Sequence, residues 1–288
     1  MDETCLKHRL TDDERQRFED DGFLVVPGVL AADRVAVLAA ATERLDAEWR
    51  PRREAPAAGS QAHEPLNLLD AIGKDDAFLE LLDLPQTFMK VVDILGWHIQ
   101  LYHSHLMITP PLPAGHVPRH PRLHWHQDSG RLNLELEGEP RSRVSLKVGF
   151  FFTSTVDTNR GNFHVVPGSH RMNRLDLPDD AEQDHPQAIA VRADAGDAVL
   201  FDRRLWHAAG RNTSAVTRKV LFLGYSYRWL RPRDDMTVSH YLPGADPIRR
   251  QLLGESPNGG FGYTSPADED VPLKTWLIER LGADGVVP

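Results

Sequence analysis

Two segments of the chain carry side chains whose types and spacing suit metal chemistry. His126 and Asp128 are two residues apart in the first segment, and His207 lies in the second. In an extended strand, residues two apart project to the same side, so an imidazole and a carboxylate would be aimed at one point. A second imidazole from a distant strand, for which His207 is the candidate, completes a two-histidine, one-carboxylate set. Such a set leaves coordination positions open and is typical of non-haem Fe(II) oxygenases.

Other residues bear on whether this set binds a metal. The chain has 14 histidines, so a His-x-Asp pair arises readily by chance. His124 competes with His126, because strand alternation places both on one face. Cys5 is the only cysteine, which excludes internal disulfides and any cysteine-rich zinc site. A metal would therefore have His, Asp or Glu ligands, which favour Fe(II), Mn or Zn.

Arg218 is a candidate for binding an anionic co-substrate beside that metal. It lies eleven residues after His207, and residues 208–214 between them supply a turn. We therefore expect the two residues to face each other across adjacent antiparallel strands. An isolated arginine is more often a surface residue, but this register favours the inner face. A guanidinium there could grip one end of a dicarboxylate whose other end chelates the metal.

The elements that must position these side chains begin with a helical first third, residues 1–96. Thr11 and Glu14 form a capping box before a helix that Gly22 ends, and a short strand over residues 23–26 follows. Two further helices are predicted over residues 65–82 and 85–95, after an exposed loop over 51–65. A long helix over residues 31–49 precedes that loop, and its inward face is predicted to carry Val35, Val37, Leu38, Ala41, Leu45 and Trp49.

The middle of the chain, residues 97–230, changes to a two-residue period. Strands are predicted over residues 99–108, 123–127, 143–153, 162–166, 189–192, 198–201 and 218–229. The proline-rich loop over 110–122 is a candidate wall or lid of a site. The last part, 231–288, holds a loop over 254–270 and a helix over 272–281.

Helices followed by strands without intervening helices indicate an α+β, mainly β fold. We expect a double-stranded β-helix, that is, a cupin-like jelly roll, with the N-terminal helices packed outside one sheet. The three parts form a single domain over residues 1–288 in this interpretation.

Composition restricts the partners that the protein can have. Hydrophobic residues make up 41% of the 288 residues and charged residues 26%, as in an ordinary globular protein. A net charge of −9 argues against a nucleic-acid surface and against attraction to anionic membranes. We find neither an apolar run of spanning length nor a secretory-type start, so we expect a cytoplasmic protein that acts on a small molecule. The sequence indicates no oligomeric state.

A series of segments gives the chain a family likeness. Residues 18–28, 103–106, 126–128, 161–170, 195–201 and 206–214 follow one another and lead to Arg218. With these segments in this order, the sequence resembles the phytanoyl-CoA dioxygenase family of Fe(II)- and 2-oxoglutarate-dependent oxygenases. The resemblance implies that His126, Asp128 and His207 bind iron and that Arg218 binds the distal carboxylate of 2-oxoglutarate. His126 is preferred to His124 because it keeps the family's His-x-Asp spacing.

The resemblance implies two further cofactor contacts. His105 falls where the family often places a co-substrate contact on the first inner strand, and Lys147 falls where another inner-face contact is expected. A lysine among apolar neighbours needs an anionic partner if it is buried, whereas on an alternating strand it can also face outward. Some members have a hydroxyl residue two positions after the second histidine, but this chain has Ala209.

The activity implied by the resemblance consumes 2-oxoglutarate and O2 at Fe(II). We expect hydroxylation of an unactivated C–H bond of a small-molecule metabolite, with release of succinate and CO2. Asp128 stands where related halogenases have a small residue that admits halide, so halogenation is disfavoured. Oxidative desaturation, epoxidation and cyclisation stay open, because they depend on substrate placement more than on ligands.

Two other classes of protein remain alternatives. A cupin-like metal isomerase or hydrolase could use the same ligands, and its turnover would be indifferent to 2-oxoglutarate. A non-enzymatic jelly roll that binds a ligand or a partner protein would not need the metal. The likeness names no substrate, and Arg122, Arg131 and Arg204 give only a weak hint of an anionic group.

Overall fold

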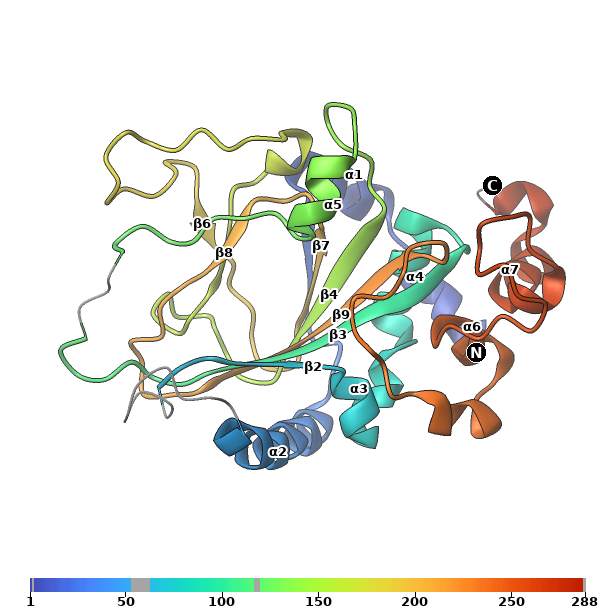
Figure 1. Cartoon of the computed structure of the whole chain (residues 1–288), viewed down its shortest axis with the longest axis horizontal. Helices are drawn as coiled ribbons and strands as arrows, with labels where there is room; N and C mark the ends of the chain where they lie inside the picture. Colours follow the sequence, from blue (N-terminus) through green and yellow to red (C-terminus); the bar gives the residue numbers. More distant parts are fainter. Residues whose placement is uncertain (2, 53–62, 117–119, 287–288) are drawn as a thin grey trace.

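The computed structural model describes residues 1, 3–52, 63–116 and 120–286, and its centre is two antiparallel sheets (Figure 1). The larger sheet has the strand order β1-β7-β4-β9-β3-β2, and the smaller has the order β6-β5-β8. The larger sheet contains β1 (Phe23–Val26), β2 (Leu66–Leu69), β3 (Ile99–Thr109), β4 (Ser145–Phe151), β7 (Ala198–Asp202) and β9 (Arg218–Tyr227). The smaller sheet contains β5 (Phe163–Val165), β6 (Ile189–Ala190) and β8 (His207–Ala209).

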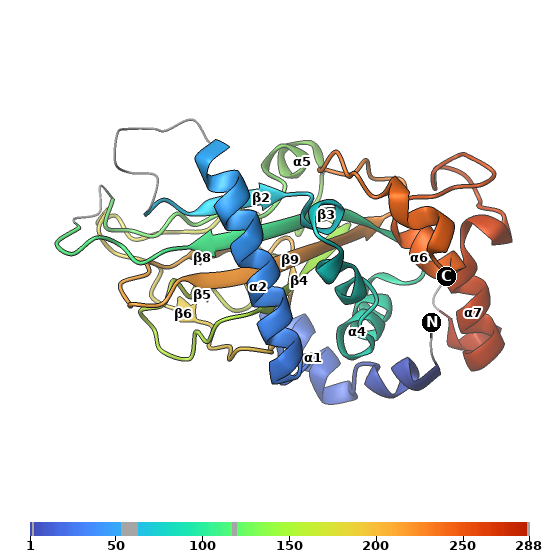
Figure 2. The same ribbon diagram turned by 90° about the horizontal axis from the view of Figure 1, so that it is seen from below.

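Three helices cover the face of the larger sheet that points away from the smaller one, namely α2 (Ala32–Trp49), α3 (Ala71–Lys74) and α4 (Pro85–Leu95). Figure 2 shows α2 crossing this face, with α3 and α4 beside it. The helices are α1 (Asp12–Asp21), α2 (Ala32–Trp49), α3 (Ala71–Lys74), α4 (Pro85–Leu95), α5 (Gly130–Glu135), α6 (Pro247–Leu252) and α7 (Pro272–Leu281). None of the helices in the described ranges is long and apolar enough to cross a membrane.

Local sequence signals explain how α1 begins and ends. Both hydrogen bonds of the predicted capping box between Thr11 and Glu14 are present. Gly22 follows the helix with a φ of 81°, a left-handed conformation that glycine adopts without steric cost. The His170 ring lies where a Cβ atom of residue 22 would be. Gly22 therefore ends the helix and lets the chain turn closely into β1.

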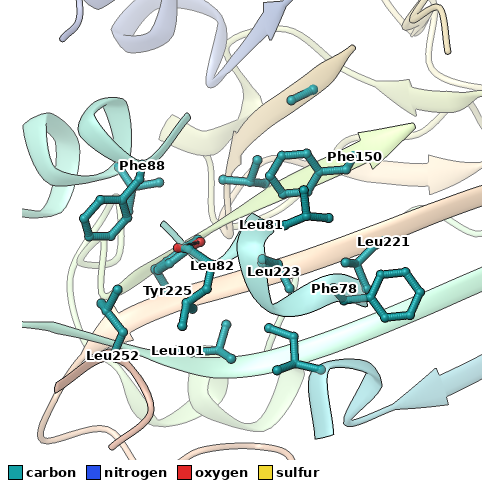
Figure 3. Close-up of a cluster of buried hydrophobic side chains, with 14 of the residues drawn as sticks. Phe78, Leu81, Leu82, Phe88, Leu101, Phe150, Leu221, Leu223, Tyr225 and Leu252 are labelled. Atoms are coloured by element: carbon teal, nitrogen blue, oxygen red, sulfur yellow. Dashed lines mark hydrogen bonds between the residues drawn. The ribbon is translucent and has the colours of Figure 1, made fainter. Parts of the chain in front are cut away.

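Strand alternation divides the larger sheet into two faces, most clearly along β4. Leu146, Val148 and Phe150 point outward into the core beneath the helices, while Lys147 and Phe151 point toward the smaller sheet. Figure 3 shows part of the outer core, where side chains of the sheet meet those of the helical segments. The labelled residues include Phe78, Leu81, Leu82, Phe88, Leu101, Phe150, Leu221, Leu223, Tyr225 and Leu252.

Several predicted elements are wrong. Residues 65–82 form no single helix; they contain β2, α3 and a 3-10 helix (Asp76–Leu81). Residues 123–127 form no strand, since only His126 makes an isolated bridge. Val37 is 49% exposed, so it does not belong to the inward face of α2. Parts of two predicted loops, residues 53–62 and 117–119, lie outside the described residues.

The relation between His207 and Arg218 also differs from the prediction of adjacent strands. The strand of His207, β8, pairs with β5 in the smaller sheet. The strand of Arg218, β9, pairs with β3 and β4 in the larger sheet. The two residues therefore belong to different sheets and line the same space between them.

Candidate metal centre

The backbone holds the two predicted histidine ligands next to each other. His126 and His207 form an antiparallel bridge, with each backbone N–H donating to the other's carbonyl at 3.0 and 2.9 Å. Their ring centroids are consequently 4.3 Å apart. The chain after His126 is fixed by a further bond at 2.9 Å, from the Asp128 N–H to the carbonyl of Arg203. The bridge to His207 and the hydrogen bond to Arg203 thus position this segment, where a strand over residues 123–127 was predicted.

Both imidazoles are oriented for metal binding through Nε2. The Nδ1 atom of His126 lies 3.0 Å from the His124 carbonyl, and that of His207 lies 2.8 Å from the Leu205 carbonyl. A carbonyl can only accept, so each Nδ1 carries the proton and leaves the Nε2 lone pair free. Burial lowers the pKa of His207 to about 4, which keeps its ring neutral at physiological pH.

Asp128 supplies the carboxylate of the set. One ligand atom from each of Asp128, His126 and His207 can be chosen so that all three lie within 4.8 Å of one another. Burial raises the pKa of Asp128, but the charge and hydrogen bond of Lys147, together with His207 and His126, outweigh burial and lower that pKa below its usual range. The second oxygen, Oδ2, is buried and has no hydrogen-bond partner. A buried acceptor without a partner indicates that a cation completes the site.

Lys147 is the partner of the other Asp128 oxygen. Its Nζ lies 2.7 Å from Oδ1, and the side chain is almost fully buried. Of the two orientations that the sequence left open for Lys147, the structure shows the inward one. This ion pair compensates the cost of burying a lysine among apolar residues.

A cavity of about 530 Å³ joins these residues to the other predicted contacts. Such a volume is typical of a site for small molecules. All six predicted site residues line it: His105, His126, Asp128, Lys147, His207 and Arg218. The apolar part of the wall comes from both sheets and comprises Met107, Phe163, Phe201, Ala209 and Phe222.

Arg218 is a buried cation without a carboxylate partner in the described part of the chain. Its Nη1 donates to the Gly161 carbonyl at 2.7 Å, while its buried Nε has no partner. Burial lowers the pKa of Arg218 to about 10, so it remains charged at neutral pH. Because an unpaired charge inside a protein is costly, this guanidinium is suited to an anionic ligand in the cavity.

His105 lies at the cavity, whereas the residues considered for substrate or metal contacts beyond the six predicted site residues do not line it. His105 lies on the cavity wall with its Nε2 3.3 Å from Asn67 Oδ1, and burial lowers its pKa to about 3. His124 does not line the cavity. The same holds for the three arginines that suggested an anionic substrate group, Arg122, Arg131 and Arg204. Arg204 instead binds Asp202, and Arg131 binds Glu135.

Sequence reasoning did not assign four polar residues of the wall to the site, namely Asn67, Gln127, Ser129 and Arg233. Asn67 lies on β2, which was predicted as helix, opposite Met107 of β3. Strand alternation on β2 would have placed Asn67 on the inner face had the strand been recognised. Arg233 follows β9 in an irregular segment, and no sequence pattern marks it.

Comparison with known proteins shows a match to one family over most of the chain. The family described as Phytanoyl-CoA dioxygenase (PhyH) matches residues 18–220, a range that contains all six predicted site residues. An ectoine dioxygenase of Streptomyces avermitilis is 25% identical over 242 residues, which cover 75% of this chain and 79% of that protein. The peroxisomal phytanoyl-CoA dioxygenase of Rattus norvegicus is 25% identical over 238 residues, with 74% and 67% covered.

Solved structures share the fold. HygX from Streptomyces hygroscopicus, solved with iron bound, has a TM-score of 0.60 at 19% identity and covers 78% of this chain and 89% of its own. The non-haem α-ketoglutarate-dependent carbocyclase SnoK from nogalamycin biosynthesis has a TM-score of 0.58 at 23% identity, with 83% and 92% covered. From the extent of the family match, the chain belongs to the phytanoyl-CoA dioxygenase family of Fe(II)- and 2-oxoglutarate-dependent enzymes.

Proposed function

We propose that this enzyme hydroxylates an unactivated C–H bond of a small-molecule metabolite, with 2-oxoglutarate converted to succinate and CO2. One observation carries the proposal: an open His-Asp-His set and an unpaired buried guanidinium line the same cavity. An isomerase or hydrolase with the same ligands would have no use for Arg218. The two facing sheets would form the family's jelly roll within a single domain over residues 1–288, in the cytoplasm.

In this proposal His126, Asp128 and His207 hold Fe(II). The iron, with 2-oxoglutarate bound, supplies the activation of O2 that C–H oxidation requires. Since all three protein ligands are present, hydroxylation is favoured over halogenation.

Other residues of the chain position the reactants and exclude water. Arg218 holds the distal carboxylate of 2-oxoglutarate, and its bond to the Gly161 carbonyl fixes the guanidinium before the ligand arrives. His105 and Lys147 are proposed as further contacts on the inner face. Phe163, Phe201 and Phe222 keep the cavity apolar, which strengthens these charged contacts.

The co-substrate assignment can be tested by titrating 2-oxoglutarate into protein loaded with Ni(II), a redox-inert substitute for Fe(II). We expect Arg218→Met to weaken 2-oxoglutarate binding about 100-fold or more, because a buried charge pair loses one partner. Lys219→Met is the matched control, since Lys219 is the next residue on β9 but points outward to Glu43. Equal affinities in wild type and Arg218→Met would refute the proposal.

A further inference from the structure

We propose that Arg233 binds an anionic group, a carboxylate or a phosphate monoester, on the substrate that is oxidised in this cavity. The inference rests on the proposed function, because it names the substrate chemistry of the same site. The cations of the cavity wall are Lys147, Arg218 and Arg233. Lys147 is paired with Asp128, and Arg218 is assigned to the co-substrate. Arg233 is the remaining cation.

The guanidinium of Arg233 has no acidic partner in the described ranges. No carboxylate there lies within 4.0 Å of it, and its one side-chain hydrogen bond joins Nη1 to His103 Nε2 at 3.4 Å. The side chain is exposed as well as lining the cavity, so it is accessible to a ligand that enters from solvent. Most of its donors are therefore available for an anion.

The chain around Arg233 is held firmly against the larger sheet. The Arg233 N–H donates to the Tyr102 carbonyl of β3 at 2.8 Å. The next residue, Asp234, accepts from the backbone N–H groups of Ser104 at 2.7 Å and Asp70 at 3.2 Å. Thr237 bonds to the Asp70 carboxylate at 2.7 Å. These contacts fix the backbone of Arg233 relative to the cavity, as preorganised binding requires.

His103 helps to orient the Arg233 side chain. Its ring is fully buried, and Nδ1 lies 2.6 Å from the Asp234 carboxylate. Because that carboxylate accepts, Nδ1 carries the proton and Nε2 presents its lone pair to the Arg233 guanidinium. Asp234 thus orients the His103 ring, and His103 in turn orients the Arg233 guanidinium. Burial lowers the pKa of His103, so the ring is uncharged and the charge of Arg233 remains available to a ligand.

The surrounding wall indicates the rest of the substrate. Met107 and Phe222 line the cavity on neighbouring strands, and Phe201 and Phe163 line it nearer to His207. A ligand that bridges Arg233 and the metal centre would lie along these apolar side chains. The substrate class that fits is therefore an apolar body with one anionic group.

The test uses protein saturated with Ni(II) and 2-oxoglutarate, so that the metal site and Arg218 are occupied before any probe is added. Two matched pairs of probes are titrated: hexanoate against hexanamide, and phenyl phosphate against phenol. In the wild type we expect the anionic member of at least one pair to bind ten times more tightly or better than its neutral partner. Arg233→Gln should reduce this preference to threefold or less.

Arg231→Gln is the matched control. Arg231 is exposed in the same segment but lines a different pocket, so its loss should leave the preference unchanged. The inference is overturned if the wild type prefers no anionic probe, or if Arg233→Gln keeps the preference. A wild type that does not bind 2-oxoglutarate at all in the presence of Ni(II) would instead refute the proposed function, so the two failures are distinguishable.

Discussion

The two faces of the larger sheet contrast sharply, although they are made by alternate residues of the same strands. The outer face presents Leu146, Val148 and Phe150 to the helices, in a continuous apolar core. The inner face presents Lys147 and Arg218 to a cavity. Two of the buried side-chain atoms that have no hydrogen-bond partner, Asp128 Oδ2 and Arg218 Nε, belong to residues of the cavity wall. The apolar contacts of the outer face therefore stabilise the fold. The unpaired polar atoms at the cavity indicate which ligands it binds, a cation at Asp128 and an anion at Arg218.

The largest expected effect on stability concerns the outer face. Phe150 is fully buried there, so Phe150→Ala should lower the free energy of unfolding by about 3–5 kcal/mol through lost contacts and the cavity that remains. Chemical denaturation of the metal-free protein measures this change. A loss below about 1 kcal/mol would contradict the division between the two faces.

Arg143 tests a partly buried polar cluster in which the charges are paired. Its guanidinium binds both Glu19 oxygens at 2.8 and 2.9 Å and Asp202 at 2.7 Å. Arg143→Gln should cost about 1.5–3 kcal/mol at neutral pH, since charged hydrogen bonds are lost. The measurement is the free energy of unfolding of both proteins as a function of pH.

The pH dependence of that cost has a defined sign. Hydrogen bonds from Arg143 lower the pKa of Glu19 from 4.5, and Arg204 and Arg143 outweigh burial to lower the pKa of Asp202. A lowered carboxyl pKa stabilises the fold above the unfolded-state pKa, and this stability is lost as the pH falls through the folded-state pKa. The gap between wild type and Arg143→Gln should therefore narrow below about pH 4.5. A constant gap would show that the carboxylates are not responsible.

Gly149→Ala changes the inner face at the residue next to Phe150. A Cβ atom there would lie 2.7 Å from the Phe222 ring, so the ring must move into the cavity. We expect a cost of about 1–3 kcal/mol, less than for Phe150→Ala, together with weaker binding of the anionic probes. Unchanged probe affinity would show that Phe222 does not shape the occupied part of the cavity.

The smallest expected effect is that of Arg218→Met on the ligand-free protein. Arg218 is buried without a carboxylate partner, so an apolar side chain of similar length should leave the free energy of unfolding within about 1 kcal/mol of wild type, or raise it. The same variant should bind 2-oxoglutarate about 100-fold or more weakly than wild type, as proposed above. A stability loss of several kcal/mol would assign Arg218 to the structure instead of the ligand.

Local sequence patterns predicted much of this fold. The capping box, α2, α4, α7 and the long strands β3, β4 and β9 lie close to the predicted positions, because each depends on local spacing and turn residues. Residues 66–69 were misjudged because a short apolar run suits a helix or a strand equally well. Only pairing with β3, far along the chain, makes them a strand.

The predicted site residues line one cavity, although the backbone that holds them differs from the prediction. His126 and Asp128 lie close together although their segment forms no strand. His207 and Arg218 belong to different sheets. Convergence depends on how the sheets face each other, which spacing along the chain does not encode. Arg233 was missed for the same reason, since only tertiary contacts bring it to the cavity.

The most direct test of the metal centre is the visible absorption of anaerobic protein with Fe(II) and 2-oxoglutarate. We predict a weak charge-transfer band in the wild type that is absent in His207→Ala and retained in His124→Ala. His124 is the matched control, because its ring lies 5.7 Å from that of His126 but does not line the cavity. A band that survives in His207→Ala, or that never forms in the wild type, would contradict the assignment of His126, Asp128 and His207 as the iron ligands.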